Sequence, residues 1–517
     1  MADRYGAAIA DRLPGQGWPS CDDSFRTVLG EHISDVLYRF IQSVTLLRAA
    51  LRDCDPCRSQ FCAVESYLPA LAVARLGAEP SVPIWLDLVP PPRPEKSALQ
   101  DSLDRKRRRL SRALRKRLPR STISRPVFLF SMSSRMEIYN NSVTDIAQAA
   151  ATAHCAFLDF DSTAPRNPDS LQSVLSFAEF PKDADAADAV IRAAVDALED
   201  CPELVPLFSI LRPQLEAATP YLMGLHALRL ESEKELLALT NAVVVGCPAR
   251  EAGFRTLGLA AKAAGHATAD LQVLLTGASG RYRPPVADMC LLTDRYTAED
   301  YATDFAVASD HISVVGSLMA DRELADIVPS GSRGAFNILL AAQPLSQHAM
   351  KSWLDALGRY CHTRSNTRVI LRAHPAQDAT RRAWMLDRLR RSAGSTQVVM
   401  SSAPRVGGDL ADANVLVTFY SNVALLAGAL GIPALALDHP VRGRIVDFDR
   451  RGAAHHIASK EALHRELDAI KGSDEPWRPE LRKRFDTRYG DGRAAERIVS
   501  VLRSLAKKNG RTPHASD

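Results

Sequence analysis

Long apolar runs are missing from this sequence of 517 residues. No stretch approaches the roughly 18 consecutive apolar residues that a membrane-spanning helix needs. Residues 1–14 also lack the apolar stretch of a secretory signal. We therefore expect a cytoplasmic protein, and its length exceeds what a single hydrophobic core serves.

The nine cysteines lack paired spacing. An odd number of scattered thiols favours a reducing compartment over a disulfide-stabilised secreted fold. The spacing in Cys54-Asp55-Pro56-Cys57, with Cys62 nearby, suits zinc ligands, but no second pair or histidine-rich segment accompanies it. We interpret these thiols as free, and we predict neither a metal ion nor a cofactor.

The net charge of +5 conceals one strongly basic segment. Residues 105–120 hold ten Lys and Arg and no acid, so the rest of the chain is net acidic. Leu103, Leu110, Leu114 and Leu118 fall near one helical face. The segment therefore fits an amphipathic helix on an anionic membrane surface, a nucleic-acid contact or a solvated linker. Base-stacking aromatics are absent there, so no nucleic-acid partner is predicted.

Helical and βα patterns divide the chain into four parts. Residues 1–125 are predicted to be a mostly helical accessory region, and residues 126–328 a Rossmann-like domain. Residues 336–475 are predicted to be a second Rossmann-like domain, and residues 476–517 a C-terminal helix and tail. The expected fold class is α/β, with two doubly wound parallel sheets that face each other across a cleft.

The strand predictions rest on short apolar runs without polar alternation, which are typical of strands buried on both faces. In the first domain they are 127–130, 155–158, 242–245, 272–275, 289–292 and 312–315. In the second domain they are 336–341, 368–371, 397–400, 415–419 and 434–437. The last predicted helix, about 493–506, carries Ile498, Val501, Leu502 and Leu505 on one face.

Two polar motifs follow predicted strands of the second domain. Arg-Ala-His-Pro at 372–375 comes where a buried strand emerges, and Tyr-Ser-Asn at 420–422 precedes the apolar helix 423–430. The serine is a natural N-cap for that helix. Helix N-termini present unpaired amides and the positive end of a dipole, so a cap beside an arginine and a histidine predicts a phosphate site. The residues that we predict to bind a nucleotide-activated ligand are Arg372, His374, Ser421 and Asn422.

With these motifs in this order, the chain resembles the GT-B glycosyltransferase superfamily. It looks most like bacterial enzymes of capsule and surface-polysaccharide synthesis, such as capsular Kdo transferases, sialyltransferases and CDP-glycerol glycerophosphotransferases. Residues 312–317 are similar to a Val-Val-Gly-Ser/Asn-Pro turn of that family, and 372–375 to its His-Pro motif. Residues 420–422 occupy the place of its Ser-Ser motif, and 431–433 that of a Gly-x-Pro. The segment 485–498 resembles the closing segment of such enzymes.

The resemblance covers about 126–505 and has three departures. Leu275-Thr276-Gly277 stands where many relatives carry Gln-His-Gly. Only one serine of the Ser-Ser pair is present. A glutamate that holds the donor ribose in many UDP- and GDP-sugar enzymes would fall near Leu426, which accepts no hydrogen bond from a hydroxyl. This absence favours a CMP- or CDP-activated donor.

Further binding and catalytic residues are expected at the same strand edges. Gly316, in the turn before the linker, and Arg442, after the strand 434–437, are predicted to contact the substrate. An inverting sugar transfer needs a group that takes the acceptor's proton. The candidates are Glu137, in the loop after the first strand, and Asp159 and Asp161, after the second. Of these we favour Glu137.

The expected activity is that of a metal-independent glycosyltransferase. It would move a sugar from a CMP- or CDP-linked donor to a bacterial surface polysaccharide or lipid-linked acceptor, with residues 105–120 at the inner face of the membrane. A nucleotide-sugar epimerase shares the fold, although Tyr-Ser-Asn at 420–422 replaces the Gly-Gly expected of one. A catalytically inactive nucleotide-sugar-binding protein would account for the missing Gln-His-Gly.

Overall fold

The computed structural model describes the chain in segments. These are residues 2–16, 18, 22–34, 37, 126–132, 137–159, 184–237, 239, 241–247, 252–273, 286–327, 334–375, 377–394, 398–439, 446–473 and 488–508. Several of the positions discussed above lie outside them: Cys54, Cys57, Cys62, the basic segment 105–120, Asp161, residues 275–277 and Arg442. Within the described segments, no helix combines the length and the hydropathy needed to span a membrane.

The first domain is built on a parallel sheet of six strands in the order β2-β1-β3-β4-β5-β6. The strands are β1 Val127–Met132, β2 Ala156–Asp159, β3 Ala242–Cys247, β4 Ala267–Leu271, β5 Met289–Leu292 and β6 Ile312–Val314. Phe128 and Phe130 of β1 pack under α5 Glu137–Thr152, while Val127 and Leu129 pack under α8 Ala252–Ala263. Because both faces are covered, the strands are mostly apolar.

The second domain holds another parallel sheet of six strands, in the order β12-β11-β10-β7-β8-β9. The strands are β7 Phe336–Ala341, β8 Thr367–Arg372, β9 Val398–Met400, β10 Val415–Thr418, β11 Ala434–Leu437 and β12 His455–Ile457. One face is covered by α11 Gln347–Thr363, α12 Ala379–Ala393 and α15 Lys460–Lys471. The other face is covered by α13 Val406–Asp412 and α14 Val423–Leu430. Counted from β7, this order is the Rossmann order 3-2-1-4-5-6.

One strand prediction was wrong and one strand was missed. The run 272–275 was predicted as a strand, but β4 begins at Ala267 and ends at Leu271. No apolar run marks β4, because two of its five residues are polar. Thr268 donates its hydroxyl to Asp288 at 2.9 Å, and buried Asp270 accepts from the Tyr301 hydroxyl at 3.2 Å. Strand β12 has three residues, two of them histidines, so no apolar run marks it.

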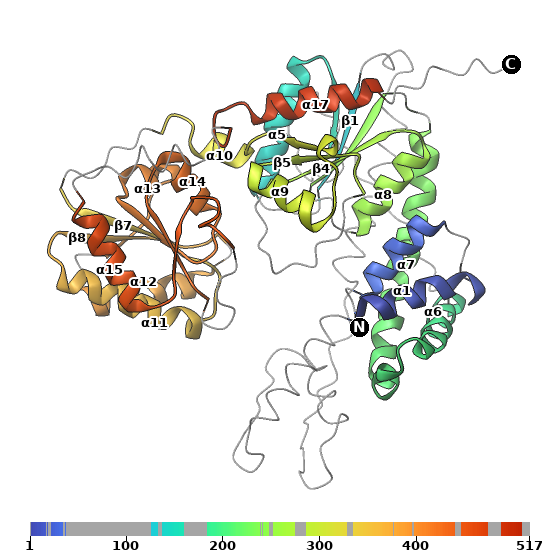
Figure 1. Cartoon of the computed structure of the whole chain (residues 1–517), viewed down its shortest axis with the longest axis horizontal. Helices are drawn as coiled ribbons and strands as arrows, with labels where there is room; N and C mark the ends of the chain where they lie inside the picture. The colour runs from blue at the N-terminus through green and yellow to red at the C-terminus, as the bar shows by residue number, and fades with distance from the viewer. Residues whose placement is uncertain are drawn as a thin grey trace, which may run out of the picture.

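A helical lobe lies beside the first sheet (Figure 1). Its helices are α1 Ala2–Arg12, α6 Ala184–Asp196 and α7 Phe208–Leu236, with short 3-10 helices at Leu13–Gln16, Ala197–Glu199 and Pro202–Leu207. Side chains from residues 5–37 and from residues 186–228 share one hydrophobic core. Ile9, Leu29, Val190 and Leu225 are among them. The N-terminal residues are therefore joined by packing to the insertion between β2 and β3.

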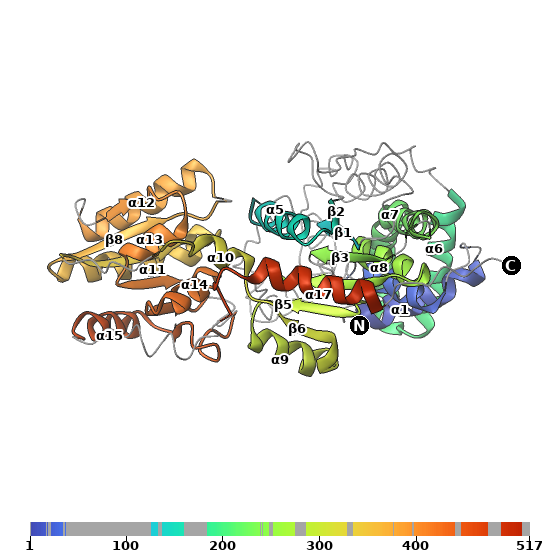
Figure 2. The ribbon, with the colours of Figure 1, turned by 90° about the horizontal axis from the view of Figure 1, so that it is seen from above.

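The C-terminal helix α17 Ala494–Lys508 returns to the first domain (Figure 2). Its apolar stripe, which includes Ile498 and Leu502, packs beside α5 in the core of the first sheet. The start of α17 is held by α10 Leu318–Glu323: the Asp321 carboxylate accepts the backbone N–H groups of Gly492 and Ala494 at 2.9 and 2.8 Å. We call α10 together with residues 488–494 the crossing. The remaining elements are α9 Arg295–Asp304 and the 3-10 helix Ser309–His311.

We expect Leu502→Ala to lower the free energy of unfolding of the first domain by about 2–5 kcal/mol, because it leaves a cavity against the sheet. Leu502 is fully buried. Denaturant unfolding followed by circular dichroism gives the difference. Arg503→Ala is the matched control on the exposed side of the same helix, with an expected change within about 0.5 kcal/mol. Equal stability of the two variants would contradict the placement of α17.

Candidate functional site

The order of strands in the second sheet reverses between β7 and β10. From β7 the chain runs through α11 to β8, and from β10 it runs through α14 to β11, on the other side. Parallel sheets of this kind bind ligands beyond the carboxyl ends of the strands at such a switch point. Here the Thr418 hydroxyl donates to the Ala341 carbonyl at 2.8 Å, which ties the two strand ends together.

The turn at 420–422 lies directly beyond β10. The helix begins at Val423, with Asn422 in the N-cap position and no hydrogen bond from the Asn422 side chain to the helix end. Ser421 was predicted to be the N-cap; it lies directly before Asn422, whose backbone angles are already helical, and the Ser421 carbonyl accepts the Ala424 N–H at 3.0 Å. Its hydroxyl still accepts the Val423 N–H, at 3.3 Å. Gly431 ends the helix with a positive φ of 71°, as expected of a C-terminal glycine.

The turn after β8 is held by Gln377, a buried residue that the sequence did not single out. Its side-chain oxygen accepts the His374 N–H at 2.8 Å, and its side-chain nitrogen donates to the Gln343 carbonyl beyond β7 at 3.0 Å. Arg382 donates to the Gln377 carbonyl at 2.9 Å. The backbone around His374 is thus fixed relative to the end of β7. Burial lowers the pKa of His374, which favours the neutral imidazole at pH 7.

Arg372 is fixed by a second polar network that the sequence did not reveal. Its Nη1 donates to Asp409 at 2.6 Å, to the Ala403 carbonyl at 3.0 Å and to Ser401 at 3.2 Å. Asp409, on α13, is 5% exposed, while the Arg372 side chain remains 26% exposed. These contacts all use one nitrogen, and a guanidinium has five N–H donors. The network orients Arg372 and leaves donors for a ligand.

A cavity of about 470 Å³ opens at the same edge of the second sheet, beyond β11 and β12. Trp353 of α11 lines it together with Asp438, Ser459 and Lys460. The Asp438 carboxylate contacts Nδ1 of His456 at 3.1 Å. Arg372, His374, Ser421 and Asn422 do not line this cavity, so these four residues and the cavity are separate features of one sheet edge.

Two of the three base candidates, Glu137 and Asp159, lie at the carboxyl edge of the first sheet. Glu137 was expected in a loop, but it is the first residue of α5, because that helix begins soon after β1 ends. Asp159 is the last residue of β2 and pairs in register with Phe130 of β1. The two acids therefore follow neighbouring strands. Within the described segments, no group of three or more His, Cys, Asp or Glu forms a metal site.

Gly316, predicted to contact the substrate, lies where two backbone segments meet. Its φ is +92°, in the region that favours glycine, and an added Cβ would lie 2.5 Å from the Arg488 carbonyl oxygen. Ser317, the next residue, is fully buried and caps α10 by accepting the Ala320 N–H at 3.2 Å. The structure thus gives Gly316 a role in the crossing.

Comparison of the sequence with models of known protein families gives no match, and neither does comparison with curated proteins. Solved structures similar to the chain include a Staphylococcus aureus MnaA–UDP complex, with a TM-score of 0.48, 12% identity and coverage of 76% of this chain and 99% of the other. The lipopolysaccharide outer core galactosyltransferase WaaB has a TM-score of 0.47, 12% identity and coverage of 74% and 99%. A glycosyltransferase from Rickettsia africae has a TM-score of 0.42, 10% identity and coverage of 75% and 94%.

The chain has the GT-B fold. Its two doubly wound parallel sheets are those predicted from the sequence, and the structure adds that the C-terminal helix crosses back to the first of them. At these identities the comparisons carry no assignment of activity or substrate, so any function must be argued from the site itself.

Gly316→Ala should lower the free energy of unfolding by about 1–3 kcal/mol, because a Cβ is strained at positive φ and meets the Arg488 carbonyl. Gly15→Ala is the control: no atom lies within 4 Å of the added Cβ. Thermal or denaturant unfolding measures both variants. If Gly316→Ala were as stable as the wild type and lost only ligand affinity, the structural role given to Gly316 would be wrong.

Proposed function

We propose that the protein is a glycosyltransferase that moves a sugar from a CMP- or CDP-linked donor to a bacterial surface polysaccharide or lipid-linked acceptor. The observation that carries the proposal is the switch point of the second sheet. It brings the turn after β8, with Arg372 and His374, and the turn after β10, with Ser421 and Asn422, to either side of the end of β7.

The chemistry of these turns suits a departing phosphate. Arg372 supplies a permanent positive charge whose position Asp409 fixes, and the lowered pKa of His374 leaves a neutral N–H donor near pH 7. The positive end of the α14 dipole lies beside Ser421, which itself accepts the Val423 N–H on its hydroxyl and the Ala424 N–H on its carbonyl. Preorganised donors of this kind stabilise developing negative charge on a leaving group without a metal ion.

The preference for a cytidine donor is supported by α14. Its eight residues, Val-Ala-Leu-Leu-Ala-Gly-Ala-Leu, include no polar side chain. Leu426 is fully buried in the core beneath the sheet. No carboxylate from this helix can hold the ribose of a UDP- or GDP-sugar, as the resemblance would require of many such enzymes.

The first domain is proposed to bind the acceptor and to supply the base. Glu137 and Asp159 follow adjacent strands at the carboxyl edge, where an acceptor hydroxyl would lose its proton. Association with an anionic membrane surface through residues 105–120 and a contact of Arg442 with the diphosphate stay predictions.

Nucleotide binding should depend on Arg372 and His374. We expect CMP or CDP to bind and to raise the melting temperature more than UDP or GDP does, since a ligand that binds only the folded state stabilises it. Arg372→Ala and His374→Ala should each weaken binding in isothermal titration calorimetry by about 1.5–3 kcal/mol, the range for hydrogen bonds to charged groups. Arg390→Ala, exposed in the last turn of α12, is the control.

Two outcomes of that experiment would count against the proposal. Unchanged affinity in both single variants would remove Arg372 and His374 from the site. A thermal shift with UDP that exceeds the shifts with CMP and CDP would overturn the cytidine preference.

A separate isotope-exchange experiment distinguishes the epimerase alternative. If a free nucleotide sugar exchanged hydrogen isotope with solvent, with no transfer to an acceptor, the protein would be an epimerase instead.

Glu137→Gln tests the proposed base. The substitution keeps the size of the side chain and removes its basicity, so turnover should fall about 10²- to 10⁴-fold while donor affinity stays nearly intact. Asp159→Asn is the matched variant on the neighbouring strand and should lose much less. Near-normal turnover of Glu137→Gln, with Asp159→Asn inactive, would assign the base to Asp159 of β2 and leave the proposed reaction unchanged.

Donor binding without turnover in the wild type, over a panel of acceptors, would indicate an inactive binding protein.

A further inference from the structure

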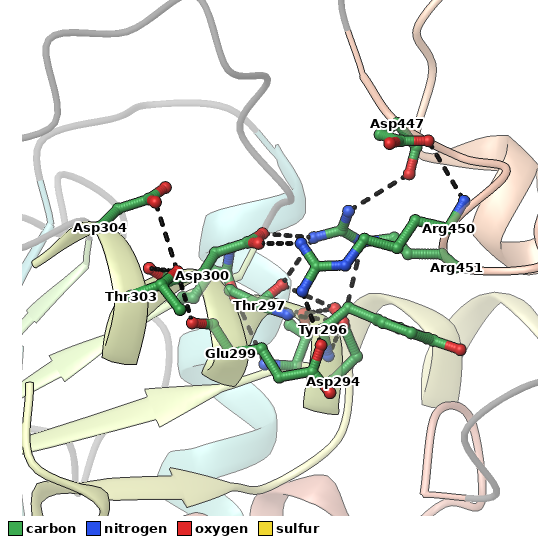
Figure 3. Close-up of polar contacts among 12 residues, drawn as sticks. Asp294, Tyr296, Thr297, Glu299, Asp300, Thr303, Asp304, Asp447, Arg450 and Arg451 are labelled. Carbon is green, nitrogen blue, oxygen red and sulfur yellow. Dashed lines mark hydrogen bonds and ion pairs between the residues drawn. The ribbon is translucent and has the colours of Figure 1, made fainter.

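Two adjacent arginines of the second domain reach the first domain. Arg450 and Arg451 lie in the turn before β12, and both contact α9, the helix that follows β5 (Figure 3). The contacts cross about 150 positions of sequence and join the two sheets at a place other than the crossing.

Arg451 makes the buried half of this contact. Its side chain is 6% exposed, and Nη2 lies 3.0 Å from the Asp300 carboxylate and 3.4 Å from the Thr297 hydroxyl. Its Nε lies 3.8 Å from Asp294, which is itself 5% exposed. A charge buried to this extent is stable only with partners of opposite sign, and here the partners belong to the other domain.

Arg450 makes the exposed half. Its two terminal nitrogens reach Asp300 at 2.5 Å and Glu299 at 2.6 Å, and its side chain is 42% exposed. The Tyr296 ring lies within reach of both guanidinium groups, at 5.9 Å from Arg450 and 6.0 Å from Arg451. Ion pairs with this much exposure are weakened by salt, whereas buried pairs are screened much less.

Each side of the contact is held rigidly by its own domain. Asp294 caps α9 by accepting the N–H groups of Tyr296 and Thr297, each at 3.0 Å. On the other side, the Arg450 N–H donates to the Asp447 carboxylate at 3.2 Å. The arginines and their acidic partners are therefore presented by two preformed turns.

The crossing differs in kind from this contact. It is continuous with the chain and uses backbone groups: Asp321 accepts two backbone N–H groups of the C-terminal segment, and Glu323 accepts the Val406 N–H at 2.9 Å. The contact at α9 uses side-chain charges, which can separate without breaking secondary structure.

We propose that Arg450 and Arg451 form an ionic latch that holds α9 against the second domain, and that the domains separate about the crossing when the latch is released. The latch sets the distance between the carboxyl edge of the first sheet and the second domain. It is independent of the glycosyltransferase proposal, because it rests on domain contacts alone.

The test is small-angle X-ray scattering of the full chain. The double variant Arg450→Ala/Arg451→Ala should shift the ratio of open to closed molecules about 10- to 100-fold, which appears as a larger radius of gyration. Arg388→Ala is the matched control, because Arg388 pairs with Asp355 at 2.5 Å within the second domain. We expect the control to scatter like the wild type. A folded double variant with the wild-type profile would overturn the proposal.

A second arm covers the case in which loss of buried Arg451 prevents folding. Arg450→Ala and Glu299→Gln alter exposed partners of the latch only. In a salt series from about 0.05 M to about 1 M, where the screening length falls from above 10 Å to about 3 Å, both should open at lower salt than the wild type. Circular dichroism confirms that each variant is folded. Identical salt profiles for the wild type and both variants would overturn the latch.

Discussion

The reversal of strand order between β7 and β10 is the constraint on which the site depends. Parallel strands must be joined by crossovers, and here the crossovers leave β7 and β10 toward opposite sides of the sheet. The turns beyond the strand ends are therefore not covered by a connection that passes over them. The Thr418–Ala341 hydrogen bond holds the two ends together beneath this point. Whatever binds there meets two helix-entry turns and the end of β8.

The buried polar residues of the second domain give the turns their shape. Gln377 links the turn after β8 to the end of β7, and Asp409 holds Arg372 from α13. A buried amide or carboxylate is costly unless its hydrogen bonds are made, so each of these side chains fixes the group it contacts. Arg372 and His374 are consequently placed by the protein before any ligand arrives, which is what efficient stabilisation of charge requires.

The sequence predicted the two sheets well because strands covered on both faces are continuously apolar, and this local property needs no partner to be recognised. Strand β4 escaped notice because Thr268 and Asp270 are buried with partners at 288 and 301, which only the folded chain brings near. Gln377 and Asp409 escaped for the same reason. The apolar stripe of α17 was predicted from the sequence, but the helix that packs against it, α5, was not. An amphipathic pattern identifies the buried face of a helix and does not identify the element that covers this face. The roles of Glu137, Asp159 and the other predicted site residues remain predictions.

Hydrogen exchange of the whole chain with and without CMP or CDP tests the central claim most directly, because backbone amides report where a ligand binds. The account predicts slowed exchange in peptides that cover 369–377 and 418–426, the two turns at the switch point. Slowed exchange confined to residues around the cavity lined by Trp353 and Lys460, with the two turns unchanged, would contradict it. So would the absence of any protection in the second domain at ligand concentrations that saturate binding.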